Sequence, residues 1–217
     1  MGTTRFVDLF LIRHGVTKWN LEKRYLGHTD QELDSEKLAE LEPIKAFFYG
    51  MKIDLVYASD LQRCVKTFHY LYPNRITCLD NRLREIYFGE WEGCTHQQLE
   101  SNVYYQAWLE NWEKVEPPNG EGYPHFAVRV LAFLHDLFHG IEMVQDVRKV
   151  ALVTHGGVIR RIMTHFLPTL NFNETGINHG RGIQLTLQHN GGDWTCSSWS
   201  EVPFLEKGDS SVTDTII

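Results

Sequence analysis

Near its N-terminus the chain contains the stretch Leu9-Phe10-Leu11-Ile12-Arg13-His14-Gly15-Val16-Thr17-Lys18-Trp19-Asn20. Its apolar part predicts a short buried strand over residues 6–12. Arg13 and His14 follow at the carboxyl end of that strand, which is the edge where open α/β sheets bind ligands. Gly15 then lets the backbone turn sharply or approach a ligand closely. The stretch therefore predicts a ligand site at one edge of a sheet, centred on His14.

A second stretch, Ala151-Leu152-Val153-Thr154-His155-Gly156-Gly157-Val158-Ile159-Arg160, repeats this design. An apolar run over 150–154 predicts a central strand, and a helix is expected from Gly156 to about residue 166. The free N–H groups at the start of that helix would face the strand tip. If the two strands are neighbours, about 4.8 Å apart, the rings of His14 and His155 can contact one small anion.

Two other segments supply charged side chains. Arg63 lies one turn into a helix predicted over 60–72, so its guanidinium can reach back over the strand ends and bind phosphate oxygens bidentately. Residues 82–93 are irregular and combine carboxylates with aromatic side chains, a setting in which a carboxyl pKa can be raised.

Each of these residues, taken alone, has an ordinary explanation. A histidine at a strand end usually caps or faces solvent, an arginine in a first helical turn is usually solvated, and a loop glutamate is usually exposed. Two His-Gly pairs after apolar strands, with Arg13 adjacent and Arg63 at a third strand end, are much harder to obtain by accident. The combination therefore favours a functional site.

Two alternative sites follow from the same residues. Two histidines and a carboxylate could form a facial metal triad. However, Arg13 and Arg63 would crowd a cation and suit an anion, and the cysteines have no metal-ligand spacing. A Rossmann dinucleotide site is excluded because no Gly-x-Gly-x-x-Gly turn follows the first strand.

Strands alternate with helices along the chain, which predicts an α/β fold. We expect a three-layer sandwich, with a mostly parallel central sheet, helices on both faces and a smaller helical lid segment. Further strands are predicted over 53–58 and 75–79, and a hairpin over 183–187 and 194–199. Further helices are predicted after Asp34, with a kink or restart at Pro43, over 95–101, over 103–113 and from about 123. We expect one domain over 1–217, a lid-like insertion over about 86–125 and a weakly ordered tail after about 203.

Composition restricts the partners. The chain has 28 acidic and 21 basic residues, a net charge of −7, which argues against binding to nucleic acid or to a membrane surface. The four cysteines are scattered and are expected to be free thiols in a reducing compartment. The early apolar run is expected to be a strand and not a signal peptide, and no run of about 18 apolar residues occurs in the sequence. We expect a cytoplasmic protein with a small-molecule partner, and the sequence leaves open whether it forms a homodimer.

The motifs resemble those of the histidine phosphatase superfamily, also called the phosphoglycerate mutase-like family. The matching blocks run in order from residue 9 to about residue 160, roughly three quarters of the chain. They are Arg13-His14-Gly15-x-Thr17-x-x-Asn20, Arg24-Tyr25-Leu26-Gly27-His28-Thr29-Asp30, Ser59-Asp60-Leu61-x-Arg63, Leu83-x-Glu85-x-x-Phe88-Gly89-x-Trp91-Glu92-Gly93, Gly120-Glu121, Arg129 and Thr154-His155-Gly156-Gly157.

The resemblance implies a metal-independent phosphatase that needs no cofactor. It implies that His14 is the nucleophile and becomes phosphohistidine, and that Glu85 is the general acid and then the base. It further implies a phosphate pocket in which a protonated His155 could add its charge to those of two arginines. The residues implied for this pocket are Arg13, Arg63 and His155, with Asn20, Thr17 and Gly156 beside them.

The chain departs from the family pattern at three places. Leu26 stands where the family often has Gln, which removes a polar contact at the pocket mouth. Residues 34–37 replace a frequent Thr-x-x-Gly, which affects the first helix more than the chemistry. Ala58 replaces a frequent Ser beside Ser59. The positions implied for catalysis are all retained.

The segment between Glu85 and Gly120 bears on the reaction type. Mutases of the family carry a long substrate-enclosing insertion there, whereas this chain has a modest helical segment that should admit water, which favours a phosphatase. The pattern is similar to α-ribazole phosphatases of cobalamin synthesis and to broad-specificity sugar-phosphate phosphatases. A phosphoglycerate mutase and a non-catalytic phospholigand-binding module are the alternatives, although mere binding would not need Glu85. Four aromatic residues either line the lid or, as we favour, pack its helices: Trp91, Trp108, Trp112 and Tyr123.

Overall fold

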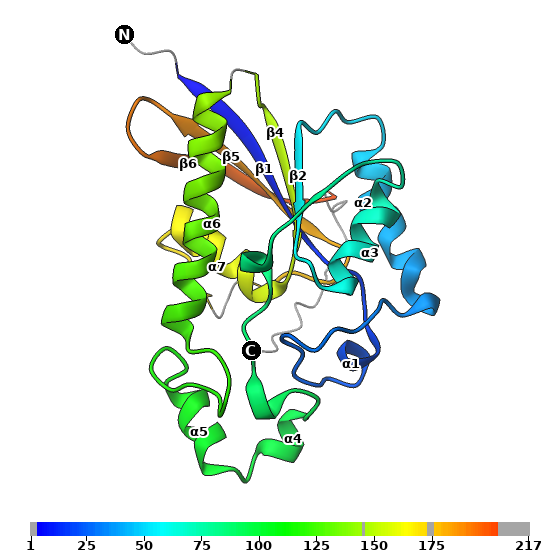
Figure 1. Cartoon of the computed structure of the whole chain (residues 1–217), viewed down its shortest axis with the longest axis vertical. Helices are drawn as coiled ribbons and strands as arrows, with labels where there is room; N and C mark the ends of the chain where they lie inside the picture. Colours follow the sequence, from blue (N-terminus) through cyan, green and yellow to red (C-terminus); the bar gives the residue numbers. More distant parts are fainter. Residues whose placement is uncertain (1–3, 145, 173–175, 204–217) are drawn as a thin grey trace.

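The computed structural model describes residues 4–144, 146–172 and 176–203, and its centre is a six-stranded sheet in the order β3-β2-β4-β1-β5-β6 (Figure 1). β5 runs antiparallel to β1 and to β6, and the other neighbours pair in parallel. The predicted mostly parallel sheet is therefore confirmed. Its strands are β1 (Arg5–Arg13), β2 (Leu55–Ala58), β3 (Cys78–Leu79), β4 (Lys149–Thr154), β5 (Gly182–His189) and β6 (Trp194–Val202).

Helices cover both faces of this sheet, which gives the predicted three layers (Figure 1). The apolar run of β1 is buried throughout because Leu9 and Leu11 face one layer, and Phe10 and Ile12 face the other. One layer contains α6 (Tyr123–Met143) and α7 (Gly156–Phe166), and the other contains η1 (Ser35–Leu41), α2 (Glu42–Phe48) and α3 (Gln62–Leu71).

The predicted interruption at Pro43 is a restart from one helix type to another. The side chain of Asp34 accepts a hydrogen bond from the N–H of Glu36 and caps η1, a 3-10 helix. Pro43 lies in the first turn of α2, where a missing backbone N–H costs nothing. The sequence therefore located both the cap and the break correctly.

Two short elements differ from the prediction. β3 has two residues, not five, because it is an exposed edge strand. The helix α1 (Lys18–Leu21) was not expected, since four residues carry no apolar period. It forms because Thr17 and Asn20 cap it reciprocally. The predicted tail after about 203 lies outside the described residues.

Residues 86–125, here called the cap, form a separate lobe at the lower end of Figure 1. The cap contains η3 (Gly89–Trp91), α4 (His96–Leu99) and α5 (Val103–Glu110), close to the two predicted helices. Tyr25 joins the cap to the N-terminal part of the chain, because its N–H donates to Cys94 O (2.9 Å) and its C=O accepts from Gly93 N (3.0 Å). The cap has its own buried aromatic cluster, which consists of Tyr25, Phe88, Trp91, Leu99, Tyr105 and Trp108.

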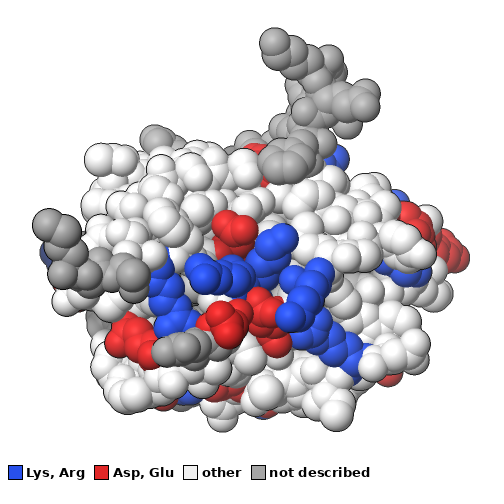
Figure 2. Space-filling model, turned by 90° about the horizontal axis from the view of Figure 1, so that it is seen from above, with Lys and Arg blue, Asp and Glu red and all other residues white. Residues whose placement is uncertain are grey.

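Acidic and basic side chains are interleaved on the face at which β1 begins (Figure 2). That face therefore offers no field of a single sign to a large polyanion. None of the helices in the described ranges combines the length and apolar character of a membrane-spanning segment.

Candidate active site

Two adjacent central strands bring His14 and His155 together. β1 pairs with β4 in parallel, with Arg13 opposite Thr154, and the N–H of His14 donates to Thr154 O (3.0 Å). The two imidazole rings lie edge to face with their centroids 5.1 Å apart. The expectation that both strands end at one sheet edge is therefore confirmed.

The imidazole of His14 is oriented by a backbone carbonyl group. Its Nδ1 lies 2.7 Å from the carbonyl oxygen of Gly15. Because a carbonyl can only accept, Nδ1 carries the proton and Nε2 keeps its lone pair. Burial, and then the nearby charge of Arg63, hold the pKa of His14 well below its ordinary value, so the ring is neutral at neutral pH. A neutral imidazole with an orienting partner is a competent nucleophile.

Arg63 is fully buried behind His14. Its Nε donates to Nδ1 of His155 (3.2 Å), and its terminal nitrogens donate to the carbonyls of Gly27 (2.6 Å) and Thr29 (3.0 Å). The loop that carries the Arg24–Asp30 motif is thereby fixed to the sheet edge. Arg63 is not among the residues that line the cavity described below, so in this structure its charge acts on His14 and His155 from within the protein.

His155 is neutral, in contrast to the protonated form considered from the sequence. Its Nδ1 must keep a lone pair to accept from Arg63, so its Nε2 carries the proton and donates to Ser59 Oγ (2.9 Å). Burial and then the charge of Arg63 lower the pKa of His155 well below its ordinary value. Both ring nitrogens therefore serve the protein, and the ring packs against His14.

Glu85 is held at the N-terminus of α7. Its Oε2 accepts from the N–H of Gly157 (2.9 Å) and its Oε1 accepts from the N–H of Ile86 (3.0 Å). These two contacts fix the orientation of the carboxyl group. A Cβ at position 157 would lie 2.2 Å from Oε1, so only glycine leaves the carboxyl group in place. From the sequence, the N–H groups at the start of α7 were expected to face a bound ligand. In the structure one of them also holds Glu85.

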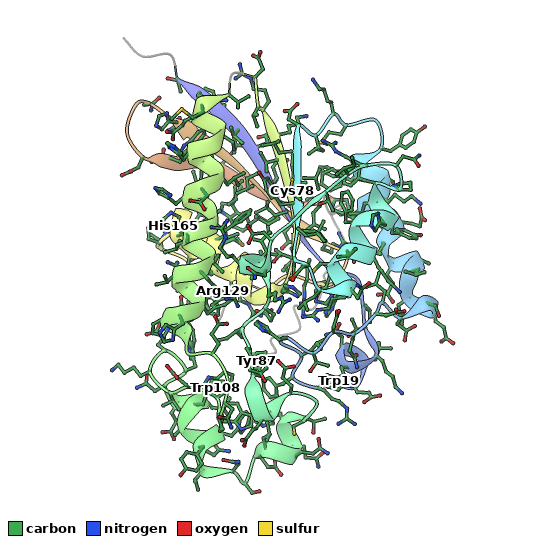
Figure 3. All side chains as sticks on the ribbon, in the orientation of Figure 1. Trp19, Cys78, Tyr87, Trp108, Arg129 and His165 are labelled. Atoms are coloured by element: carbon green, nitrogen blue, oxygen red, sulfur yellow. The ribbon has the colours of Figure 1, made fainter. Side chains whose placement is uncertain are left out.

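The backbone of Glu85 is clamped by Arg129 from α6. Arg129 donates to the carbonyls of Glu85 (2.8 Å) and Arg84 (2.6 Å), and its guanidinium pairs with Glu121 (2.7 Å). His28 adds a contact of 3.0 Å from its Nε2 to the same Glu85 carbonyl. Figure 3 shows Arg129 beside α6, near Tyr87, with Trp108 farther down in the cap. These contacts explain how an irregular segment can hold Glu85 rigidly.

A cavity of about 510 Å³ opens in front of His14. Of the site residues expected from the sequence, Arg13, Asn20, Glu85 and Gly156 line it, whereas Arg63, His155 and Thr17 do not. Thr17 is fully buried and its hydroxyl donates to Asn20 Oδ1 (2.9 Å), so it orients Asn20 instead of meeting a ligand. Arg13 Nη1 donates to the carbonyl of Ile177 (2.5 Å).

An aromatic wall continues this cavity from His14 toward the cap. Trp112 stacks on Phe172 with ring centroids 4.8 Å apart and meets Tyr123 edge to face at 4.4 Å. The wall consists of Trp108, Trp112, Tyr123, Phe126 and Phe172. The packing role that the sequence favoured holds for Trp91, which is 2% exposed and does not line the cavity. Trp108, Trp112 and Tyr123 pack in the cap and also line the cavity.

The model of the histidine phosphatase superfamily (branch 1) matches residues 9–202. The chain belongs to this family. It is 30% identical over 163 residues to the adenosylcobalamin/α-ribazole phosphatase of Escherichia coli K12, which covers 73% of this chain and 78% of the relative. It is 27% identical over 212 residues to phosphoglycerate mutase-like protein 4 of Arabidopsis thaliana, covering 93% and 88% of the two chains. The crystal structure of a putative α-ribazole-5′-P phosphatase from Escherichia coli K-12 superposes with a TM-score of 0.76 at 26% identity, covering 88% and 94%.

Three cavity residues of this histidine phosphatase were not singled out from the sequence. His179 lies beside His14, with ring centroids 5.2 Å apart, and Arg160 lies 5.9 Å from the centre of the Phe172 ring. His179 and Phe172 are in the segment between α7 and β5, where nothing in the sequence indicates proximity to the nucleophile. The antiparallel pairing of β5 with β1 creates that proximity. In the described part of the chain, no three His, Cys, Asp or Glu side chains are grouped to hold one metal ion.

Proposed function

We propose that this chain hydrolyses a small phosphate monoester through a phosphohistidine at His14. The observation that carries the proposal is a neutral imidazole whose Nδ1 proton is held by Gly15 O, so that its Nε2 lone pair is available in a cavity shared with Arg13 and Glu85. Phosphoryl transfer requires mainly positioning and neutralisation of charge, which these residues supply.

In the first half-reaction, the Nε2 lone pair of His14 forms a bond to phosphorus while the bond from phosphorus to the ester oxygen breaks. The carboxyl group of Glu85 gives its proton to the departing alkoxide, which leaves as an alcohol. Arg13 lies at the cavity wall and balances the negative charge of the phosphoryl oxygens. Arg63 adds its charge from behind His14 and holds His155 in place.

In the second half-reaction, water attacks the phosphohistidine. The carboxylate of Glu85 takes a proton from the water as its oxygen bonds to phosphorus. The bond from phosphorus to nitrogen breaks, its electron pair returns to Nε2 of His14, and inorganic phosphate leaves. Glu85 thereby regains the proton that the first half-reaction used.

The aromatic wall supports a leaving group that carries a ring. Trp112, Tyr123 and Phe172 line the cavity on its way from His14 to the cap, and flat aromatic surfaces bind flat apolar groups well. Two Escherichia coli relatives are named as α-ribazole phosphatases, and α-ribazole is a ring-bearing alcohol. We therefore propose α-ribazole phosphate, or another phosphate ester of a ring-bearing alcohol, as the substrate class.

The reaction type is tested by hydrolysis of a chromogenic aryl phosphate in the presence of a chelator. The wild-type chain should release inorganic phosphate, and His14→Ala should release none. His165→Ala, at the far end of α7 and outside the cavity lining, is the matched control and should retain full activity. Full activity of His14→Ala would reject the proposal, and a requirement for added metal would redirect it to a metal-assisted reaction.

The substrate class is tested with a panel of α-ribazole 5′-phosphate, a sugar phosphate and 3-phosphoglycerate. The ring-bearing ester should have the highest kcat/KM, and Trp112→Ala should raise its KM about tenfold while leaving the KM of the sugar phosphate unchanged. Equal kcat/KM values across the panel would contradict the role of the aromatic wall. Phosphoryl exchange between phosphoglycerates faster than their hydrolysis would establish a mutase instead.

A further inference from the structure

His14 has a histidine on each side, and the two differ in what they face. The ring centroid of His155 lies 5.1 Å and that of His179 lies 5.2 Å from the centroid of His14. Both nitrogens of His155 are committed to Arg63 and Ser59, and His155 does not line the cavity. Of the two neighbours, His179 is the one that lines the cavity.

The ring of His179 has a nitrogen atom that makes no hydrogen bond to the described residues. Its Nε2 is shielded from water and has no hydrogen-bond partner among the described residues. A buried polar atom without a partner is costly and is rare in folded proteins. Burial and then the charge of Arg13 hold the pKa of His179 well below its ordinary value, so the ring is neutral and carries one N–H donor. Such a donor is suited to an anionic oxygen.

The backbone around His179 is fixed to the nucleophile itself. The N–H of Gly180 points to the carbonyls of Arg13 (3.2 Å) and His14 (3.3 Å). The N–H of Arg13 donates to Arg181 O (2.9 Å), and its guanidinium donates to Ile177 O. Gly180 has a φ of +66°, and a Cβ there would lie 3.1 Å from the carbonyl oxygen of Glu40. The chain therefore holds His179 rigidly beside His14 and Arg13.

We propose, building on the phosphohistidine route, that His179 donates a hydrogen bond to a non-bridging oxygen of the phosphoryl group as it moves to His14. The phosphoryl group would then lie between the guanidinium of Arg13 and the imidazole of His179. Together with Arg13 and the attacking Nε2 of His14, His179 then fixes the orientation of the phosphoryl group. Orienting contacts of this kind contribute to phosphoryl transfer because they align the attacking and leaving atoms.

The test is the affinity for orthovanadate, which imitates the five-coordinate phosphoryl group and needs no leaving group. His179→Phe keeps the ring and removes the donor, and it should weaken vanadate binding about tenfold or more. His179→Asn and His179→Gln place an amide N–H near the positions of Nδ1 and Nε2 respectively, and one of them should restore affinity to within about threefold of wild type. His165→Phe is the matched control and should bind vanadate as wild type does. Circular dichroism and urea unfolding establish that each variant is folded.

The outcomes separate this role from packing and from the proposed hydrolysis. Vanadate affinity unchanged in His179→Phe would overturn the inference, as would a loss that neither amide variant restores. If the wild-type chain hydrolyses esters while His179→Phe binds vanadate normally, the phosphatase stands and the role of His179 fails. If vanadate binding depends on His179 but no ester is hydrolysed, the ligand role stands and the phosphatase fails.

Discussion

At the scale of single residues, the chemistry depends on which proton each group holds. Gly15 O fixes the tautomer of His14, and Arg63 fixes that of His155. Arginine is protonated at any pH of interest, so its donation onto a ring nitrogen excludes an imidazolium there. In the proposed mechanism these histidines start neutral, and Glu85 carries the proton.

Substitution of Glu85 by glutamine tests this division of labour. Glu85→Gln should lower kcat about a hundredfold or more, since an amide can neither give nor take the proton, and vanadate affinity should stay close to wild type because Arg13 and His14 are untouched. Steady-state kinetics and vanadate titration measure the two quantities. A variant that hydrolyses esters at the wild-type rate would show that another group carries the proton.

At the scale of elements, the N-terminus of α7 has two functions. It follows β4 directly, so it brings free N–H groups to the sheet edge, and Gly157 uses one of them to hold Glu85 (2.9 Å). The absence of a side chain at this position is a requirement of the site, because a Cβ would meet the carboxyl group at 2.2 Å.

Gly157→Ala should therefore lower kcat about a hundredfold by displacing the carboxyl group, while the free energy of unfolding changes little because alanine favours a helix. The matched control is Gly140→Ala in α6, where an added Cβ meets nothing within 4 Å. That variant should keep full activity and gain up to about 1 kcal/mol of stability. Kinetics and urea unfolding of both variants check the prediction. A fully active Gly157→Ala would contradict the positioning of Glu85 by α7.

The sequence predicted the elements that have strong patterns. The run of β1, the periodic face of α6 and the restart at Pro43 are local signals, and all were found. α1 was missed because reciprocal capping by Thr17 and Asn20, and not periodicity, stabilises it. β3 was predicted too long because pairing to β2 at the sheet edge, and not composition, sets its length.

The candidate site divides in the same way. Arg13, His14, Asn20, Glu85 and Gly156 were identified from motifs, and the structure places them around the cavity. Thr17 was expected beside the phosphate, but its hydroxyl is used to orient Asn20. His179 lies in no motif that we identified, and its proximity to His14 arises from the antiparallel pairing of β5 with β1. Long-range pairing of this kind cannot be inferred from a local pattern.

At the scale of the whole molecule, the buried histidines of the site make the stability of the fold depend on pH. His14, His155 and His179 are all held with pKa values well below the ordinary value, mainly by burial. In the unfolded chain these histidines regain a pKa of about 6.5. Below that pH the unfolded chain binds protons that the folded chain does not. Stability is therefore fully present above about pH 7.5 and falls as the solution is acidified.

The free energy of unfolding should decrease by up to about 1.4 kcal/mol per pH unit for each of these histidines between about pH 6 and pH 5. Urea unfolding across this range measures the slope. His179→Phe removes one titrating group, so its unfolding free energy should depend less steeply on pH, by the contribution of one histidine. A pH-independent stability of the wild-type chain would contradict the burial of neutral histidines.

Trapping the intermediate tests whether His14 carries the phosphoryl group. The enzyme is mixed with a phosphate-labelled aryl ester, quenched with alkali within the first turnover, and digested for mass spectrometry. We predict an alkali-stable, acid-labile phosphoryl group on the peptide that contains His14, longer-lived in Glu85→Gln and absent from His14→Ala. Rapid ester hydrolysis with no label on His14, or label on another residue, would contradict a phosphohistidine intermediate at His14.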